Sequence, residues 1–293
     1  MKRLIVKTGP TGVGKTGIAI RVAEALNTEI VSADSRQLYR DIPIGTAAPD
    51  AEQLARVKHH FIGTLSLDEY YSAAQFETDA LKVIDKIFET HDYAVMCGGS
   101  MMYVDAICKG IDDIPTISDE IRTKVMNDYN EHGIEYIREE LQRLDPEYCK
   151  IVDRNNHKRI VHAIEICLQA GVPYSTLRTG NKKERPFEIL KFGINLPRPE
   201  LFDRINRRVD MMMEEGLEEE ARKVYPLRHL NSLNTVGFKE MFAWFDGTMD
   251  YVTARERIKK NTRVYAKKQL TWYAKDPDII WITPDENEIM SRL

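Results

Sequence analysis

The sequence predicts an α/β protein with a parallel sheet core, helices on both faces and an inserted all-helical domain. Three observations support this prediction. Strand and helix patterns alternate through the first 110 residues, which is typical of parallel strands joined by crossover helices. A glycine-rich phosphate-binding pattern lies between the first strand and the first helix. Residues 118–170 then carry helix signals and no convincing strand.

Composition excludes several classes of protein. At 293 residues the chain fits two domains of about 150 residues each. It is 43% hydrophobic with a net charge of -4, which is a globular composition rather than a disordered one. No apolar run reaches the roughly 18 residues that a membrane span needs. The phosphate-binding pattern begins at Gly9, which leaves no room for a removable leader. We therefore expect a cytoplasmic protein that is not bound to a membrane.

The elements of the core follow from local patterns. The β-branched run at 4–6 predicts the first strand, and apolar spacing predicts a helix over 18–26. A second strand is expected over 29–34, a helix over 68–90 and a third strand over 93–97. Gly98 and Gly99 end that strand, and another helix begins near Met101. The sequence returns to strand character at 187–195 and to a helix at 199–213.

Between these parts, caps and breakers predict a group of helices. Ser118 opens a helix that stops at His132 and Gly133, and a second helix runs over 134–144. Asn156 caps a third, which ends near Gln169. We therefore expect a core formed by residues 1–110 and 186–293, with residues 111–185 as an inserted helical domain.

The strongest motif matches G-x-x-x-x-G-K-[ST] and predicts a core like that of P-loop NTPases. Backbone N–H groups of such a loop face an anion, its lysine adds a charge and its final hydroxyl can hold Mg²⁺. The pattern predicts a site for phosphate or pyrophosphate. Its residues are Gly9, Pro10, Thr11, Gly12, Val13, Gly14, Lys15 and Thr16.

What happens to the bound phosphate is left open by the motif. The third strand ends in Met-Cys-Gly-Gly-Ser, whereas hydrolytic P-loop proteins carry an aspartate there. Asp34 follows the second strand, whose carboxyl end faces the same crevice as the loop. This side chain could serve as a general base, a metal ligand or a helix cap. A kinase or NTPase that acts on a small metabolite is therefore one hypothesis.

Several segments together resemble the tRNA dimethylallyltransferases, the IPP transferase family, over nearly the whole chain to about residue 275. Individually these segments are unspecific, but their combination is highly specific. They read GPTGVGKT, DSRQLYRDIPIGTAAP, HHFI, GGSMMY, RNNHKRIVHAIEI, NTVGFKEM and RVYAKKQLTWY. Adenylate isopentenyltransferases share the first two segments but have a much reduced helical insertion, so its presence favours the tRNA enzymes.

The resemblance implies a reaction. The family transfers a dimethylallyl group from dimethylallyl diphosphate to N6 of the adenosine on the 3′ side of the anticodon. For this chain, the resemblance implies that the phosphate loop binds the diphosphate together with a Mg²⁺ ion held by Thr16. It also implies that Thr11 contacts the bridging oxygen of the diphosphate. Asp34 becomes the general base, and the catalytic arginine falls on Arg208. On residue pattern alone, two arginines four positions apart are also typical of a solvated helix face, an interpretation that is stronger for Arg204 than for Arg208.

The resemblance also assigns contacts to the anticodon stem-loop of tRNA, and we expect a monomer. Gln37 can read a base edge, because its amide both donates and accepts. Ala48, His162 and Asn234 depart from residues that are basic in the family pattern. The assigned contacts are Asp34, Ser35, Arg36, Gln37, Ser100, Arg122, Lys158, Arg159, Ile160, Val161, His162, Asn234, Thr235, Val236, Gly237, Phe238 and Lys239.

Although the net charge is mildly acidic, the basic residues are concentrated in one segment. Residues 254–275 carry eight basic side chains and one acidic one, with aromatic residues between them. Such a segment is typical of a surface that binds a phosphate backbone, although a solvated helix would read the same way. A non-catalytic RNA-binding protein is the remaining alternative. Three further segments are interpreted as structural: His59–His60 as a loop, 211–213 as core packing and 214–220 as a solvated helix face.

Overall fold

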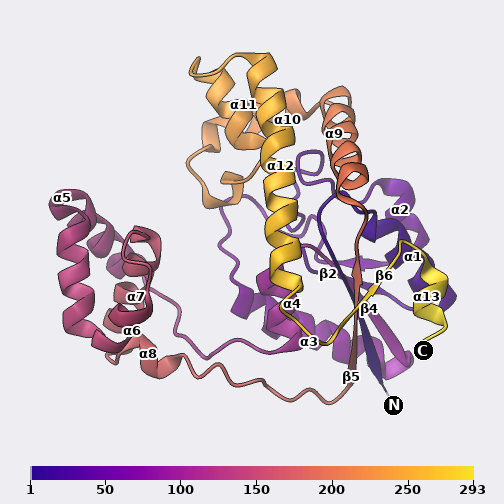
Figure 1. Ribbon diagram of the computed structural model, residues 1–293, viewed down its shortest axis with the longest axis horizontal. Helices are drawn as coiled ribbons and strands as arrows, with labels where there is room; N and C mark the ends of the chain where they lie inside the picture. The colour runs from indigo at the N-terminus through magenta and orange to yellow at the C-terminus, as the bar shows by residue number, and fades with distance from the viewer. Residues whose placement is uncertain (1) are drawn as a thin grey trace. The chain divides into compact units, whose positions relative to one another are not determined.

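The computed structural model describes residues 2–293 and contains one parallel sheet of six strands (Figure 1). Its strand order is β3-β2-β4-β1-β5-β6, so the first strand lies inside the sheet. Every pairing is parallel, as the predicted crossover helices require. The strands are β1 (Arg3–Thr8), β2 (Ile30–Ser32), β3 (His59–His60), β4 (Tyr93–Cys97), β5 (Glu188–Ile194) and β6 (Ile279–Ile282).

The chain divides into two compact units, one of which interrupts the other in sequence. The first contains the residues up to Cys108 together with Glu184–Leu293, and the second is Lys109–Lys183. The first unit holds α1 (Lys15–Ala25), α2 (Ala51–Arg56), α3 (Ala73–Thr90), α4 (Met101–Cys108), α9 (Arg198–Glu214), α10 (Leu217–Val224), α11 (Phe238–Phe245), α12 (Tyr251–Tyr273) and α13 (Glu286–Met290).

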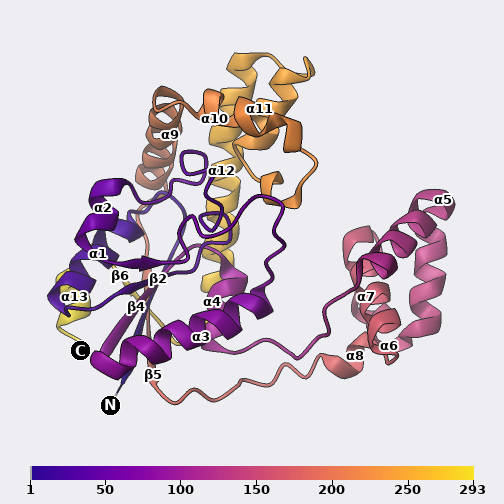
Figure 2. The same ribbon diagram turned by 180° about the vertical axis from the view of Figure 1, so that it is seen from behind.

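Both faces of the sheet are buried. Neighbouring strand residues point to opposite sides of the sheet, so they join different hydrophobic clusters. Leu4 and Val6 belong to a hydrophobic cluster with α3 and α4, which cover one face (Figure 2). Ile5 belongs to a second cluster with α1, which covers the other face. This two-sided burial is the reason that the strands read as continuous apolar runs and not as alternating ones. The predicted parallel α/β core is confirmed.

Two helices begin at other residues than the sequence predicts, because their N-cap residues determine where they start. Helix α1 begins at Lys15, directly after Gly14 in a left-handed conformation (φ 93°), and not at residue 18. Helix α3 begins at Ala73, because the Ser72 side chain accepts a hydrogen bond from the Gln75 N–H. Residues 68–72 therefore lie outside the predicted helix over 68–90.

The loop predicted at His59 and His60 is wrong. These two residues form β3 at the edge of the sheet, paired with Ile30 and Val31. The His60 Nε2 atom lies 2.5 Å from a carboxylate oxygen of Glu29. A strand of two residues has too little sequence to show an alternating pattern, so periodicity could not detect it.

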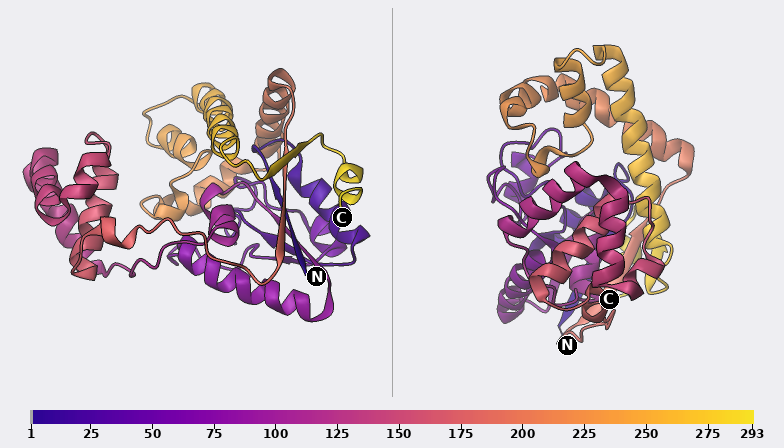
Figure 3. Two further views of the ribbon diagram at one scale, coloured as in Figure 1. Left: turned by 60° about the horizontal axis from the view of Figure 1, so that its bottom comes forward. Right: turned by 90° about the vertical axis from the view of Figure 1, so that its left-hand side faces the viewer.

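The second unit is entirely helical and has its own hydrophobic cluster, centred on Ile137, Leu141 and Ile164. The predicted break at Gly133 is confirmed by its non-helical backbone (φ 79°, ψ -172°) inside α5. Figure 3 shows α5, α6 and α7 side by side in this unit. Its helices are α5 (Asp119–Leu144), α6 (Pro146–Ile151), α7 (His157–Ala170) and α8 (Tyr174–Leu177), of which α6 and α8 were not predicted. No helix in the described part of the chain is long and apolar enough to cross a membrane.

Candidate active site

The phosphate loop joins β1 to α1 and is held against the next strand of the sheet. Gly9 has a φ of 140°, and a Cβ atom there would lie 2.4 Å from the carbonyl oxygen of Ile194. Only glycine therefore fits this point of closest approach. The first turn of α1 follows, so its free N–H groups and dipole face the loop.

The Lys15 side chain folds back onto the loop that precedes it. Its ammonium group donates hydrogen bonds to the carbonyl oxygens of Gly9 and Pro10, each at 3.0 Å. Burial lowers the pKa of Lys15 to about 8, and the positive charge of Arg208 acts in the same direction. A positive charge in this position favours an anion as ligand.

Asp34 follows β2 and is held in a tight turn. Its Oδ1 atom accepts hydrogen bonds from the backbone N–H of Arg36 at 2.9 Å and of Gln37 at 3.4 Å. Ser100, between β4 and α4, supports the turn, because its hydroxyl accepts from the Ser35 N–H at 2.8 Å. Among the described residues, both hydrogen bonds to the Asp34 carboxylate reach Oδ1, which leaves Oδ2 available. The side chain is therefore a turn-forming cap with one unused oxygen.

The next two side chains of this segment already have protein partners. Arg36 donates to the carbonyl oxygens of Asn231 and Ser232, each at 3.0 Å. Gln37 donates to the carbonyl oxygens of Thr46 and Ala47 at 3.2 and 3.0 Å. These bonds fix the segment after β2, and Gln37 would have to exchange them to read a base edge. That role of Gln37 stays a prediction.

Arg208 reaches the loop from α9. Its Nη2 atom donates to the Thr11 hydroxyl at 2.5 Å. The Nε atom is buried and has no hydrogen-bond partner among the described residues. Burial lowers the pKa of the guanidinium, while Asp34 raises it. A buried cationic donor without a partner is costly unless a ligand completes its hydrogen bonds. Arg204, on the same helix, also lies at the loop, 3.0 Å from where a Gly14 Cβ would be.

Some of these residues line a cavity of about 340 Å³. Thr11, Asp34 and Arg208 line it, so the cavity joins the loop to the carboxylate. Part of its wall is apolar and is formed by Val209, Met212, Leu217, Val236 and Ile258. Met212 therefore faces a cavity and is not only core packing, as the sequence pattern suggested. The lining also includes Ser35, Arg36, Ser100, Asn234, Thr235, Gly237 and Lys239, all predicted site residues.

Sequence reasoning missed the contribution of α12. Gln269 is 1% exposed, and its amide accepts from the Thr11 N–H at 2.8 Å and donates to the Gly99 carbonyl at 2.7 Å. Thr262 and Tyr265 lie on the same side of the helix and line the cavity. The signal was present in the sequence, because polar residues recur at helical spacing along a face that also carries Ile258.

Glu220 corrects the interpretation of 214–220 as a solvated helix face. Its side chain is 7% exposed, and its carboxylate accepts hydrogen bonds from the backbone N–H groups of Ile44 and Gly45 at 2.8 and 2.7 Å. Burial raises the pKa of this carboxyl group, and the two backbone donors oppose that rise. Glu220 thus holds the segment that carries Gly45 and Thr46 in the cavity wall.

The remaining predicted contacts fall into three structural groups. Phe238 is fully buried in the core, where its ring packs against Gly45. Ile160 and Val161 are buried in the cluster of the helical unit, so their side chains are not available for contact. The helical unit exposes Lys158, Arg159 and His162, with Arg122 half-buried, and none of these lines the cavity.

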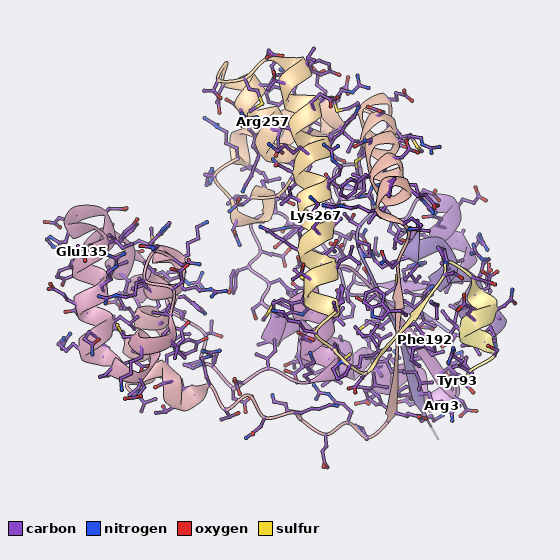
Figure 4. All side chains as sticks on the ribbon, in the orientation of Figure 1. Arg3, Tyr93, Glu135, Phe192, Arg257 and Lys267 are labelled. Carbon is purple, nitrogen blue, oxygen red and sulfur yellow. The ribbon has the colours of Figure 1, made fainter. Side chains whose placement is uncertain are left out.

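The basic segment forms most of α12, and part of its charge is used within the protein. Arg255 and Lys259 pair with Asp210 at 2.5 and 2.8 Å. Figure 4 shows Arg257 and Lys267 at well-separated points along this helix. The exposed basic side chains that remain are Arg257, Lys260, Lys267, Lys268 and Lys275.

Fold and site together define an α/β protein in which a phosphate-loop motif at the N-terminus of α1 adjoins a cavity with a carboxylate and an apolar wall. The model of the IPP transferase family matches residues 37–276. The chain belongs to this family. It is 57% identical to tRNA dimethylallyltransferase 1 of Phocaeicola vulgatus over 291 residues, 99% of this chain and 97% of the relative. A protein of Parabacteroides distasonis, tRNA dimethylallyltransferase 2, is 56% identical and covers 98% of this chain and 96% of its own.

Solved structures agree with this assignment. The tRNA isopentenylpyrophosphate transferase of Bacillus halodurans is 34% identical, with a TM-score of 0.72 over 100% of this chain and 94% of that one. A eukaryotic dimethylallyltransferase acting on tRNA gives a TM-score of 0.82 at 25% identity, over 98% of this chain and 75% of that one.

Proposed function

We propose that this chain transfers a dimethylallyl group from dimethylallyl diphosphate to N6 of the adenosine on the 3′ side of the tRNA anticodon, releasing pyrophosphate. One observation carries this proposal: a single cavity joins the phosphate loop, the Asp34 carboxylate and an apolar wall. The loop suits the diphosphate, the wall suits a five-carbon chain, and the carboxylate suits an amine that must lose a proton. Relatives that match over nearly the full chain are named for this reaction.

The proposed reaction forms one bond and breaks another. The N6 nitrogen attacks the allylic carbon, the carbon–oxygen bond to the diphosphate breaks, and its electron pair leaves with pyrophosphate. In this proposal Arg208 and Thr11, which are hydrogen-bonded to each other, donate hydrogen bonds to that leaving oxygen. Asp34 accepts the N6 proton on Oδ2, because Oδ1 is occupied by backbone donors. The backbone and Lys15 hold the remaining diphosphate oxygens.

The residues fit Mg²⁺ bound chiefly through the substrate. Thr16 lies in the first turn of α1, half-buried, and offers one hydroxyl oxygen. No group of three or more His, Cys, Asp or Glu side chains suited to a metal occurs among the described residues. Mg²⁺ commonly takes one or two protein ligands and completes its shell with phosphate oxygens and water. When bound, it would neutralise part of the charge on the diphosphate.

For the RNA, we propose that the anticodon stem-loop contacts the cavity mouth, the helical unit and α12. Asn234 and Lys239 are exposed at the cavity, and Lys158, Arg159 and His162 are exposed on the helical unit. The exposed basic side chains of α12 add a surface for the phosphate backbone. The target base must leave its stack to reach Asp34, as in other enzymes that modify a base. We propose that the chain acts as a monomer.

The test is to incubate the protein with dimethylallyl diphosphate, Mg²⁺ and unmodified tRNA, and to analyse the digested nucleosides. We expect a prenylated adenosine and an equal amount of pyrophosphate. A tRNA in which that adenosine is replaced by guanosine should give no product. ATP turnover with a small alcohol, in the absence of any prenylated nucleoside, would overturn the proposal in favour of a kinase.

A further inference from the structure

The cavity of the candidate active site has an open end and a closed end. Asn234 and Lys239 line it and are exposed. Met212, Leu217 and Ile258 also line it, and they are only 8%, 0% and 2% exposed. The open end therefore carries polar side chains, whereas the closed end, formed by these three residues, is apolar.

Helices α9 and α12, which both line this cavity, lie side by side and run in opposite directions (Figure 1). The Arg263 guanidinium donates to the side-chain oxygen of Asn206 at 2.5 Å. One turn later in α9, Asp210 pairs with Lys259, which lies one turn earlier in α12, at 2.8 Å. A step toward the C-terminus of α9 therefore corresponds to a step toward the N-terminus of α12.

This arrangement places the closed end away from the phosphate loop. Arg208 and Gln269 contact the loop at Thr11. Met212 comes one turn after Arg208 in α9, about 6 Å along the helix axis. Ile258 comes about three turns before Gln269 in α12. A prenyl group whose diphosphate is held at the loop therefore extends along α9 toward Met212.

The closed end is rigid, because it is part of the protein core. Met212, Leu217 and Ile258 belong to one hydrophobic cluster of the first unit. Leu217 is packed from behind as well: a Cβ atom at Gly45 would lie 2.4 Å from the buried Phe238 ring and 3.1 Å from Leu217. Side chains packed this closely do not move aside without a cost in stability, so the depth of the closed end is fixed.

We propose that Met212 limits the prenyl donor to five carbons. An apolar pocket by itself favours a longer chain, because each additional buried methylene strengthens binding. A longer donor is therefore rejected only where a side chain blocks its path. Met212 has this position, since it lies at the closed end and one turn beyond the arginine that contacts the loop. This inference rests on the proposed function.

The experiment supplies the full chain with unmodified tRNA, Mg²⁺ and an equimolar mixture of dimethylallyl diphosphate and geranyl diphosphate, its ten-carbon analogue. Mass spectrometry of the digested nucleosides gives the ratio of the two products, which equals the ratio of the two kcat/KM values. Because both donors compete for the same enzyme molecules, this ratio does not depend on how much of a variant is folded.

The variants are Met212→Ala, Met212→Val and, as a matched control, Met211→Ala. Met211 precedes Met212 in α9, but it is 55% exposed and does not line the cavity. We expect the wild type and Met211→Ala to prefer the five-carbon donor by about 100-fold or more. Met212→Ala should narrow this preference by about tenfold or more. Met212→Val should narrow it by a smaller factor, since it removes fewer atoms.

The inference is overturned if the wild type uses both donors equally, or if Met212→Ala keeps the preference of Met211→Ala. Should Met212→Ala give no product, the same comparison is made with Met212→Val. A wild type that forms no prenylated nucleoside removes the proposed function, and calorimetric dissociation constants of the two donors then decide the inference. It is retained if Met212→Ala gains affinity for geranyl diphosphate relative to dimethylallyl diphosphate and Met211→Ala does not, and it is rejected otherwise.

Discussion

At the scale of single residues, Asp34 can be tested without disturbing its turn. An Asp34→Asn side chain keeps an oxygen that accepts from the Arg36 and Gln37 N–H groups, but it is no longer a base. We expect the single-turnover rate of prenyl transfer to fall about 100-fold or more, with nearly unchanged affinity for dimethylallyl diphosphate. Rapid-quench kinetics and calorimetry measure the two quantities.

The matched control for that variant is Asp50→Asn. Asp50 also accepts a backbone hydrogen bond, from the Gln53 N–H at 2.8 Å, and it does not line the cavity. Its activity should be unchanged. A fully active Asp34→Asn protein would reduce Asp34 to a turn-forming residue.

Lys7 is a second residue with a measurable consequence. It lies in β1 with no exposed surface, and its amine has no hydrogen-bond partner among the described residues. Burial lowers its pKa from 10.5 to about 7. Between these pH values the unfolded chain binds more protons at this residue than the folded one does. The contribution of Lys7 to the free energy of unfolding therefore rises with pH, by at most about 1.4 kcal/mol per pH unit.

We expect Lys7→Met to raise the free energy of unfolding at pH 7 by roughly 1–3 kcal/mol, because it removes a buried unpaired amine. The advantage over the wild type should shrink as the pH rises from 7 to 9. Urea denaturation of both proteins at several pH values measures this, and other titrating groups cancel in the difference. Parallel pH profiles would show that Lys7 is solvated or paired.

At the scale of elements, α12 contacts the phosphate loop through the Gln269 side chain. Gln269→Leu leaves the Thr11 N–H and the Gly99 carbonyl without their partner, which costs about 1–3 kcal/mol of stability. Because Thr11 belongs to the loop, we also expect diphosphate affinity to fall about fivefold or more. Thermal unfolding and calorimetric titration provide the readouts. Substitution of the exposed neighbour, Lys268→Ala, should change neither the stability nor the diphosphate affinity. Equal effects of the two variants would contradict the role given to the Gln269 hydrogen bonds.

How well elements and site residues could be predicted depended on the range of the interactions that fix them. Residues 93–97 and the break at Gly133 were predicted correctly because apolar runs and breakers are local signals. Strand β3 was not predicted, because it is defined by its pairing with β2, which is distant in sequence. The sequence pattern predicted a solvated Glu220. Its side chain is buried because the folded chain brings the backbone N–H groups of Ile44 and Gly45 to its carboxylate. Phe238 fell in a matched segment, but its large apolar side chain is needed in the core.

At the scale of the whole molecule, the net charge of -4 says little about an RNA partner. Some basic side chains pair with carboxylates, and others in the same segment stay exposed without such a partner among the described residues. Asp210 pairs with Arg255 and Lys259, while Lys260 and Lys268 remain exposed on the same helix. An acidic protein can therefore present a basic helix to a phosphate backbone, and its RNA affinity should depend on that helix and not on the total.

The division into two units allows a test of what each contributes. The chain enters and leaves the helical unit side by side, since the Lys183 N–H donates to the Lys109 carbonyl at 2.8 Å. The unit also has a hydrophobic cluster of its own. Replacing residues 109–183 by a short glycine-serine linker should therefore leave a core that unfolds cooperatively and binds dimethylallyl diphosphate as the full chain does.

The same excision removes Lys158, Arg159 and His162, so tRNA affinity should fall at least about 10-fold at moderate salt, with a shallower salt dependence. Circular dichroism, calorimetry and anisotropy at several salt concentrations measure these outcomes. Unchanged tRNA binding by the excised protein would contradict a contact role for the helical unit. A core that no longer folds would show that the two units depend on each other for stability, although each has a separate hydrophobic cluster.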